Sequence, residues 1–170
     1  MSSIDLEFYL YHNTPMIDVK VWRNTHNDYK KLSMIFDTGA YLTTISSDLA
    51  DILCYTPIGQ KTYVSSVGGS KEAYYSVIPD LKFGDFSFGA VAALVIDFSE
   101  DMRSDAVLGM NMIKHFDTSI IFDEGSLKKG VIKLQPRFSL DELKRADDFD
   151  YRYSRFGIWN ISKSGTSIDC

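Results

Sequence analysis

Apolar and polar residues alternate along the first part of the chain, which is the pattern of half-buried β-strands. In the second such segment, Ile17, Val19 and Val21 share one face, while Asp18 and Lys20 share the other. Several strands with tight connections in a short space indicate a β-rich fold. Strands are predicted at residues 4–11, 16–22 and 31–36, with a turn at 12–15 and a polar loop at 24–28.

The third strand runs directly into a carboxylate, in the sequence Met34-Ile35-Phe36-Asp37-Thr38-Gly39-Ala40. An acid at the end of a buried strand is costly unless something there uses it or compensates its charge. Gly39 lets the backbone turn tightly and bring its amides close to the carboxylate. Asp37 is therefore the first candidate for chemistry, and β-branched residues 43–45 resume as a strand.

The middle of the chain predicts one short helix and two hairpins. Ser46 and Ser47 offer N-cap oxygens and Asp48 suits the first turn, so a helix is expected to about Leu53. Glycine-containing segments then separate β-prone runs. Hairpins are predicted from strands 62–64 and 73–78 and within 81–88, turning at Gly84-Asp85, and a buried strand is predicted at 91–98. Tyr63, Tyr74 and Tyr75 are expected to be packing residues and not catalytic ones, with a place in the lining of a cleft as the alternative for one of them.

A second motif, Ala106-Val107-Leu108-Gly109-Met110-Asn111-Met112-Ile113, places a glycine at the end of an apolar strand. Met112, Ile113 and Phe116 have helical spacing and predict a short helix. Strands at 120–122 and 131–134, joined by a turn at 123–126, are expected to form a last hairpin.

Composition narrows the class of protein. The chain has 170 residues, a formal charge of −5 and 45% hydrophobic residues, which indicates a soluble globular chain with one domain and an extension. No basic stripe suggests nucleic acid as a partner, and the longest apolar run, 90–96, is too short to span a membrane. The N-terminus lacks a signal-peptide pattern, so a cytoplasmic location is expected.

Metal and disulfide chemistry is not expected. Cys54 and Cys170 are the two cysteines, and two reduced thiols are preferred over a disulfide. Three scattered histidines, His12, His26 and His115, form no ligand pair.

The run at 34–40 resembles the active-site loop of aspartic proteases, in the Asp-Thr-Gly-Ala form typical of retropepsin-like enzymes. The motif at 106–113 resembles the helix region that packs beneath that loop. The tip at Val67-Gly68-Gly69 resembles the flap that closes over substrate, although an ordinary β-hairpin would have the same pattern. The resemblance covers residues 4–136.

The resemblance implies an all-β fold with one or two short helices, a single-lobe acid-protease barrel. Residues 1–136 would form the protease domain and 137–170 a partly helical, aromatic-rich C-terminal extension. No metal or organic cofactor is implied. The implied site is Asp37 as the catalytic acid, Thr38, Gly39 and Ala40 supporting its loop, Val67, Gly68 and Gly69 in the flap, and Leu108, Gly109 and Asn111 beneath the site.

Aspartic proteolysis needs two carboxylates that share one proton. The chain offers one convincing loop, so two copies are expected to meet as a symmetric homodimer with both Asp37 carboxylates at the axis. By resemblance, Thr38 would hydrogen-bond across the axis, and an extended polypeptide would be the substrate. The alternative is a catalytically silent, dimeric peptide-binding module with the same fold.

Two features depart from the family pattern. Retroviral enzymes pair an Asp with an Arg where this chain has Tyr41 and Met110, and an apolar contact between these two is expected to replace the ion pair. Asp117-Thr118-Ser119 repeats the catalytic triplet without its glycine and is interpreted as a turn at the end of a helix.

The C-terminal segment lies beyond the resemblance. Ser139 and Glu142 have capping-box spacing, which predicts a helix start, and residues 147–153 mix acids with aromatics. A segment so rich in aromatics is expected to pack on something. Covering its own domain, enlarging a dimer interface and occupying the cleft are the three alternatives.

Overall fold

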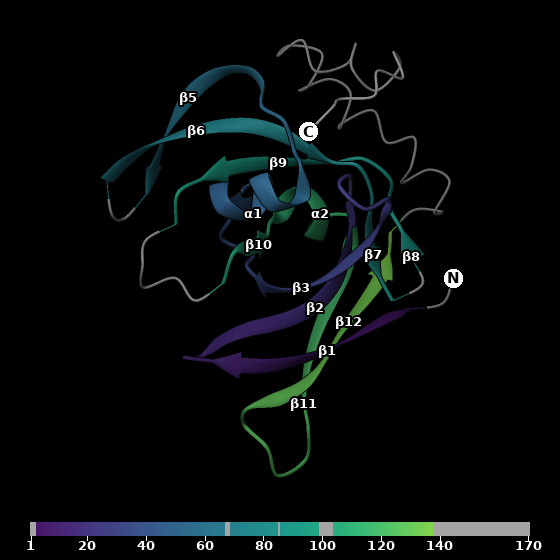
Figure 1. Ribbon diagram of the computed structural model, residues 1–170. Coiled ribbons are helices and arrows are strands. Elements are labelled where there is room, and N and C mark those ends of the chain that lie inside the picture. The colour runs from purple at the N-terminus through teal and green to yellow at the C-terminus, as the bar shows by residue number, and fades with distance from the viewer. Residues whose placement is uncertain (1–2, 67–68, 85, 99–103, 138–170) are drawn as a thin grey trace.

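The computed structural model describes residues 3–66, 69–84, 86–98 and 104–137, which form a strand-rich fold with two short helices (Figure 1). The strands are β1 (Ile4–Tyr11), β2 (Thr14–Arg23), β3 (Asp28–Phe36), β4 (Thr43–Ser46), β5 (Ile58–Ser66), β6 (Gly69–Ile78), β7 (Leu81–Phe83), β8 (Phe86–Ser87), β9 (Val91–Ile96), β10 (Ala106–Leu108), β11 (Phe116–Phe122) and β12 (Lys129–Pro136). The helices are α1 (Ser47–Leu53) and α2 (Met110–Ile113).

The strands join in one sheet in the order β11-β12-β1-β2-β3-β10-β4-β9-β6-β5, with β7 paired to β2 and to β8. Figure 1 shows the sheet curling so that β1, β2 and β3 lie on one side of the molecule and β5, β6 and β9 on the other, with the helices between. The alternating apolar faces of these strands point into one core, whose fully buried members include Ile17, Met34, Ile45, Ile78 and Leu108. The expectation of an all-β fold with short helices is confirmed.

The N-terminal strands follow the predicted alternation; β1 has the predicted bounds, and β2 and β3 are longer than predicted. His12 and Asn13 both have positive φ, 46° and 62°, and make a two-residue turn, so Pro15 lies within β2 and not in the turn. A proline is tolerated near the start of a strand, where its missing N–H costs least. The third strand, β3, begins at Asp28, whose carboxylate forms a 2.6 Å ion pair with Arg23.

Strand β10 lies between β3 and β4 in the sheet, although β3 and β4 are close in sequence and β10 comes much later in the chain. It runs parallel to β3, with Leu108 opposite Phe36, and antiparallel to β4, with Ala106 opposite Ile45. The Asp37 loop, which joins β3 to β4, therefore passes the end of a strand from the second motif. This crossing brings the two sequence motifs together.

Helix α1 is as predicted, and strand β9 begins at Val91 as predicted but ends at Ile96, before the predicted end at residue 98. The side chain of Ser46 caps α1 by accepting the Leu49 N–H at 3.1 Å. Five of the six residues in β9 are buried, as expected for a strand covered on both faces.

Three local predictions are wrong. Phe116 begins β11 instead of continuing α2, so Asp117-Thr118-Ser119 lies in a strand and not in a turn at the end of a helix. Tyr63 is 72% exposed and is not a packing residue, whereas Tyr74 packs against the core. Cys54 takes part in a disulfide, against the expectation of reduced thiols.

Some predictions fall on residues outside the described ranges: Val67 and Gly68 at the hairpin tip, Asp85, and the extension beyond Arg137 with its helix start at Ser139. The hairpin itself is confirmed, because β5 pairs with β6 up to Ser66 opposite Gly69. Within the described ranges, no helix has the length and apolar character needed to cross a membrane.

Candidate active site

Asp37 directly follows β3, and its loop holds it by backbone hydrogen bonds. The Asp37 N–H donates to the Leu108 carbonyl at 3.1 Å, which fixes the loop to the end of β10. The Gly39 N–H donates to Asp37 Oδ1 at 2.7 Å, and the Ala40 N–H donates to the Asp37 carbonyl at 3.3 Å. The carboxylate is thus oriented by the backbone of its own turn, as Gly39 led us to expect.

The loop leaves its polar groups accessible. Asp37 is half-buried, whereas Thr38 and Gly39 are exposed. A half-buried carboxylate with one oxygen accepting an amide N–H can still present the rest of the group to a ligand or to a second carboxylate.

Helix α2 is joined to the loop through its first residues. The Met110 N–H donates to the Ala40 carbonyl at 2.8 Å, and the Asn111 N–H donates to the Tyr41 carbonyl at 3.1 Å. The free N–H groups at the start of a helix need acceptors, and here the loop carbonyls supply them. The two sequence motifs are therefore parts of one site.

The side chain of Asn111 connects three elements. Its Oδ1 accepts the Thr43 N–H at 2.7 Å and the Thr43 hydroxyl at 2.9 Å, and its Nδ2 donates to the Ala92 carbonyl of β9 at 3.0 Å. Thr43 is fully buried, and its Oγ1 also accepts the Gly109 N–H at 3.3 Å. This network fixes β4, β9 and α2 to one another directly behind the loop.

Gly109 allows the close approach on which this arrangement depends. A Cβ added there would lie 2.4 Å from the carbonyl carbon of Leu42 and 2.7 Å from the Thr43 nitrogen. Both are backbone atoms, which cannot rotate away as a side chain could. Only a residue without a side chain fits between β10 and the loop.

Seven predicted site residues are brought together: Asp37, Thr38, Gly39 and Ala40 in the loop, and Leu108, Gly109 and Asn111 beneath it. Gly69 lies in the β5–β6 hairpin, at the start of β6. Thr43 was not predicted as a site residue; the available signal was a threonine at the start of the strand after the loop, whose hydroxyl can face the second motif.

The predicted apolar contact between Tyr41 and Met110 stays a prediction. The side chain of Tyr41 is 60% exposed, while Met110 packs against the core. Their segments are adjacent, because the Met110 N–H reaches the carbonyl of Ala40, the residue before Tyr41.

Comparisons with known proteins give the family and the fold of the chain. The sequence model of a family described as aspartyl protease matches residues 19–112, more than half of the chain. The crystal structure of a retropepsin-like aspartic protease from Rickettsia conorii is similar, with a TM-score of 0.55 and 17% identity, over 78% of this chain and 91% of that chain. The EIAV protease complexed with the inhibitor HBY-793 has a TM-score of 0.45 and 22% identity, over 62% of this chain and 90% of that one.

No curated protein matches the sequence. The family match nevertheless spans the Asp37 loop and Gly109, and the strand order places both in one site. The chain has the retropepsin-like fold and belongs to the aspartyl protease family.

Proposed function

We propose that this protein is an aspartic endopeptidase that hydrolyses peptide bonds through a water molecule activated by two Asp37 carboxylates, one from each subunit of a homodimer. The observation that carries the proposal is the loop geometry. Asp37 stands at the end of a buried strand, and a backbone N–H, that of Gly39, orients its carboxylate at 2.7 Å. A domain that served only to bind peptides would not need an acid at this position.

Two copies are needed because the chemistry needs two acids in different protonation states. One carboxylate, ionised, removes a proton from water, while the other, protonated, polarises the carbonyl of the substrate. The chain carries a single Asp-Thr-Gly sequence, and Asp117-Thr118-Ser119 lies in β11, where Asp117 forms a 2.8 Å ion pair with Arg137. The second acid is therefore proposed to come from Asp37 of another copy.

The remaining roles follow from the same arrangement. Thr38, exposed beside Asp37, would hydrogen-bond to the partner subunit's loop and keep the two acids aligned. The β5–β6 hairpin, with Val67, Gly68 and Gly69 at its tip, would cover an extended polypeptide substrate. Residues 1–136 would make up this catalytic unit.

The test is cleavage of a diverse peptide library by the wild-type chain and by Asp37→Asn. The variant should lose at least about a thousandfold of the cleavage rate, because asparagine can neither accept nor hand on the proton. Sedimentation should give the same oligomeric state for both chains, and a statine-type mimic should inhibit the wild type. Peptide binding by the wild type without cleavage at any pH would contradict the proposal.

The rate of cleavage should also depend on pH in a bell shape, with a mildly acidic maximum. A pair of close carboxylates works with one proton between them, so activity falls when both are protonated and when both are ionised. Ala40 offers no hydroxyl to the outer carboxylate oxygens. A rate that still rises below about pH 3 would contradict this expectation.

A further inference from the structure

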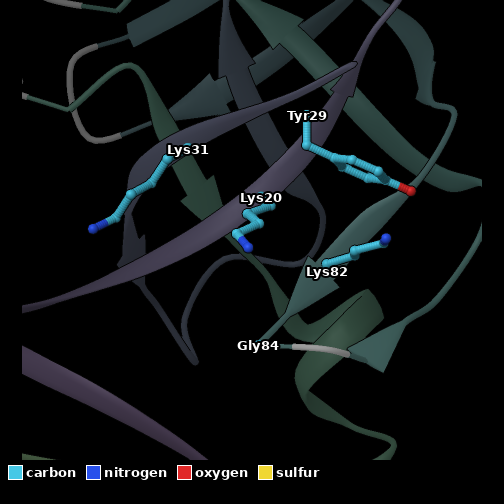
Figure 2. Close-up of a pocket in the computed structure, with 5 residues that line it drawn as sticks. All are labelled: Lys20, Tyr29, Lys31, Lys82 and Gly84. Atoms are coloured by element: carbon cyan, nitrogen blue, oxygen red, sulfur yellow. The ribbon is translucent and has the colours of Figure 1, made fainter. Parts of the chain in front are cut away.

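A pocket lies on the outer face of the sheet where β2, β3 and β7 meet. Its volume is about 270 Å³, and its lining residues are Lys20, Tyr29, Lys31, Lys82 and Gly84 (Figure 2). None of them belongs to the Asp37 loop or to α2. The pocket is thus separate from the site proposed for catalysis.

The pairing of the strands places three lysines in a row across this face. Lys20 of β2 lies opposite Lys31 of β3 on one side and opposite Lys82 of β7 on the other. Like charges directly opposite each other destabilise a sheet. Negative charge close to such a row reduces the repulsion between the three ammonium groups.

The nearby carboxylates leave this positive charge only partly balanced. Asp18 forms a 2.7 Å ion pair with Lys31. Asp80 accepts hydrogen bonds from the Tyr29 hydroxyl at 2.5 Å, the Ser87 hydroxyl at 2.6 Å and the Gly89 N–H at 3.0 Å, and its negative charge also acts on Lys82. Within the part of the chain that the structure describes, Lys20 has no carboxylate at ion-pair distance.

The ring of Tyr29 forms part of the wall of the pocket. The ammonium of Lys82 lies 3.9 Å from the centroid of that ring, and the ring is held by the hydroxyl bond to Asp80. Figure 2 shows the side chains of Lys20 and Lys82 on the same side of the sheet as Tyr29. A cation held against an aromatic ring is partly shielded from water, which strengthens its attraction for an anion.

We propose that this pocket binds one oxyanion, a carboxylate or a phosphate group, between the ammonium groups of Lys20 and Lys82, while Lys31, paired with Asp18, extends away from them (Figure 2). Lysine ammonium groups act as point charges toward such groups, and charge-assisted hydrogen bonds are among the strongest polar contacts in proteins. The chain carries a net charge of −5, so a local excess of lysines is not a consequence of overall composition.

The anion could be free in solution or could belong to this chain. Asp147, Asp148 and Asp150 follow Arg137 by about ten residues, and ten extended residues reach about 33 Å. Strand β12 ends opposite Phe116, whose ring centroid is 6.4 Å from that of Phe83, the residue after Lys82. A free anion and the carboxylates of this chain would both offer negatively charged oxygen atoms to the pocket, so the experiment has to distinguish between them.

The experiment is a titration of the full chain with inorganic phosphate at low ionic strength, followed by the NMR shifts of backbone amides. We expect saturable shifts centred on Lys20, Tyr29 and Gly84, and an affinity about tenfold weaker in Lys20→Gln and in Lys82→Gln. Lys133→Gln, which removes an exposed lysine of β12, is the matched control and should bind as the wild type does. Thermal unfolding of each variant reports whether it is folded.

A second chain with Asp147, Asp148 and Asp150 all changed to asparagine separates the two sources. Phosphate binding that becomes several-fold tighter assigns the pocket to the chain's own carboxylates, and unchanged binding assigns it to a free anion. The proposal would be overturned by shifts that fail to saturate in both chains, or by folded Lys20→Gln and Lys82→Gln variants that bind phosphate as tightly as the wild type does.

Discussion

Gly109 lies against the backbone of Leu42, where an added Cβ would stand 2.4 Å from the carbonyl carbon. Its N–H donates to Thr43 Oγ1, and its carbonyl accepts the N–H groups of Met112 and Ile113 in α2. One residue thus joins β10, the strand after the Asp37 loop, and the helix beneath it. Any side chain at this position must push the loop away from its support.

We predict that Gly109→Ala destabilises the protein by about 3 kcal/mol, because the methyl group meets backbone atoms that cannot rotate aside. Urea unfolding measures the change. Gly125→Ala is the control, since Gly125 has open space around it and a φ of +74°, and should cost only about 1 kcal/mol. Equal losses in the two variants would mean that the contact with Leu42 has no special cost.

At the scale of single residues, sequence identified the site through its short motifs. Asp37, Gly39, Gly109 and Asn111 were predicted because each stands in a recognisable run. Thr43 was not predicted, because its hydroxyl has meaning only through Asn111, a partner 68 residues later in the chain. A hydrogen bond between distant segments leaves no periodic signal in either segment.

Helices and strands were predicted well where their own residues show which face is buried. They were predicted poorly where pairing with a distant segment of the chain decides the structure. The alternation in β1 and β2 and the continuous apolar run of β9 gave their positions. The position of β10 between β3 and β4 comes from long-range pairing, which neither pattern can encode. Phe116 has helical spacing from Met112, yet it is buried at the start of β11, opposite Pro136. Either structure would bury that ring, so the pattern could not distinguish them.

The β7–β8 hairpin shows how one carboxylate can hold an element in place. Burial raises the pKa of Asp80, but hydrogen bonds from Ser87, Tyr29 and the Gly89 N–H and the charge of Lys82 outweigh it, so this pKa lies below its ordinary value. A lowered pKa in the folded state stabilises the fold above the ordinary carboxyl pKa of about 4. That contribution is lost as the pH falls through the folded-state pKa.

We therefore predict that Asp80→Asn makes the free energy of unfolding less dependent on pH between about pH 2 and pH 6. The variant should be less stable than the wild type near pH 6, and the difference should shrink toward pH 2. Urea unfolding at a series of pH values measures both. Glu7→Gln, at an exposed position of β1, is the control and should follow the wild-type curve, whereas an Asp80→Asn curve parallel to the wild type would refute the prediction.

At the scale of the whole molecule, the chain holds one Asp-Thr-Gly loop, whereas the proposed reaction needs two carboxylates. The sheet brings one Asp-Thr-Gly loop and its supporting helix together, and the proposed second acid has to come from outside the chain. The need for a second copy could be predicted from the sequence, because the chain contains a single Asp-Thr-Gly motif. How two copies would pair could not be predicted, because an interface depends on the shape of a surface assembled from many segments.

The need for two copies can be tested by mixing subunits. When wild-type chains exchange with an equal amount of Asp37→Asn chains, random pairing leaves about a quarter of the dimers with two aspartates, so the cleavage rate should fall to about half that of the wild type alone. The reason is that each mixed dimer contains a wild-type subunit without a second acid. Mixing immediately before the assay, with no time for exchange, should leave the rate unchanged. If the rate is also unchanged after full exchange, each copy works alone, and the proposal that Asp37 acts across a symmetry axis is wrong.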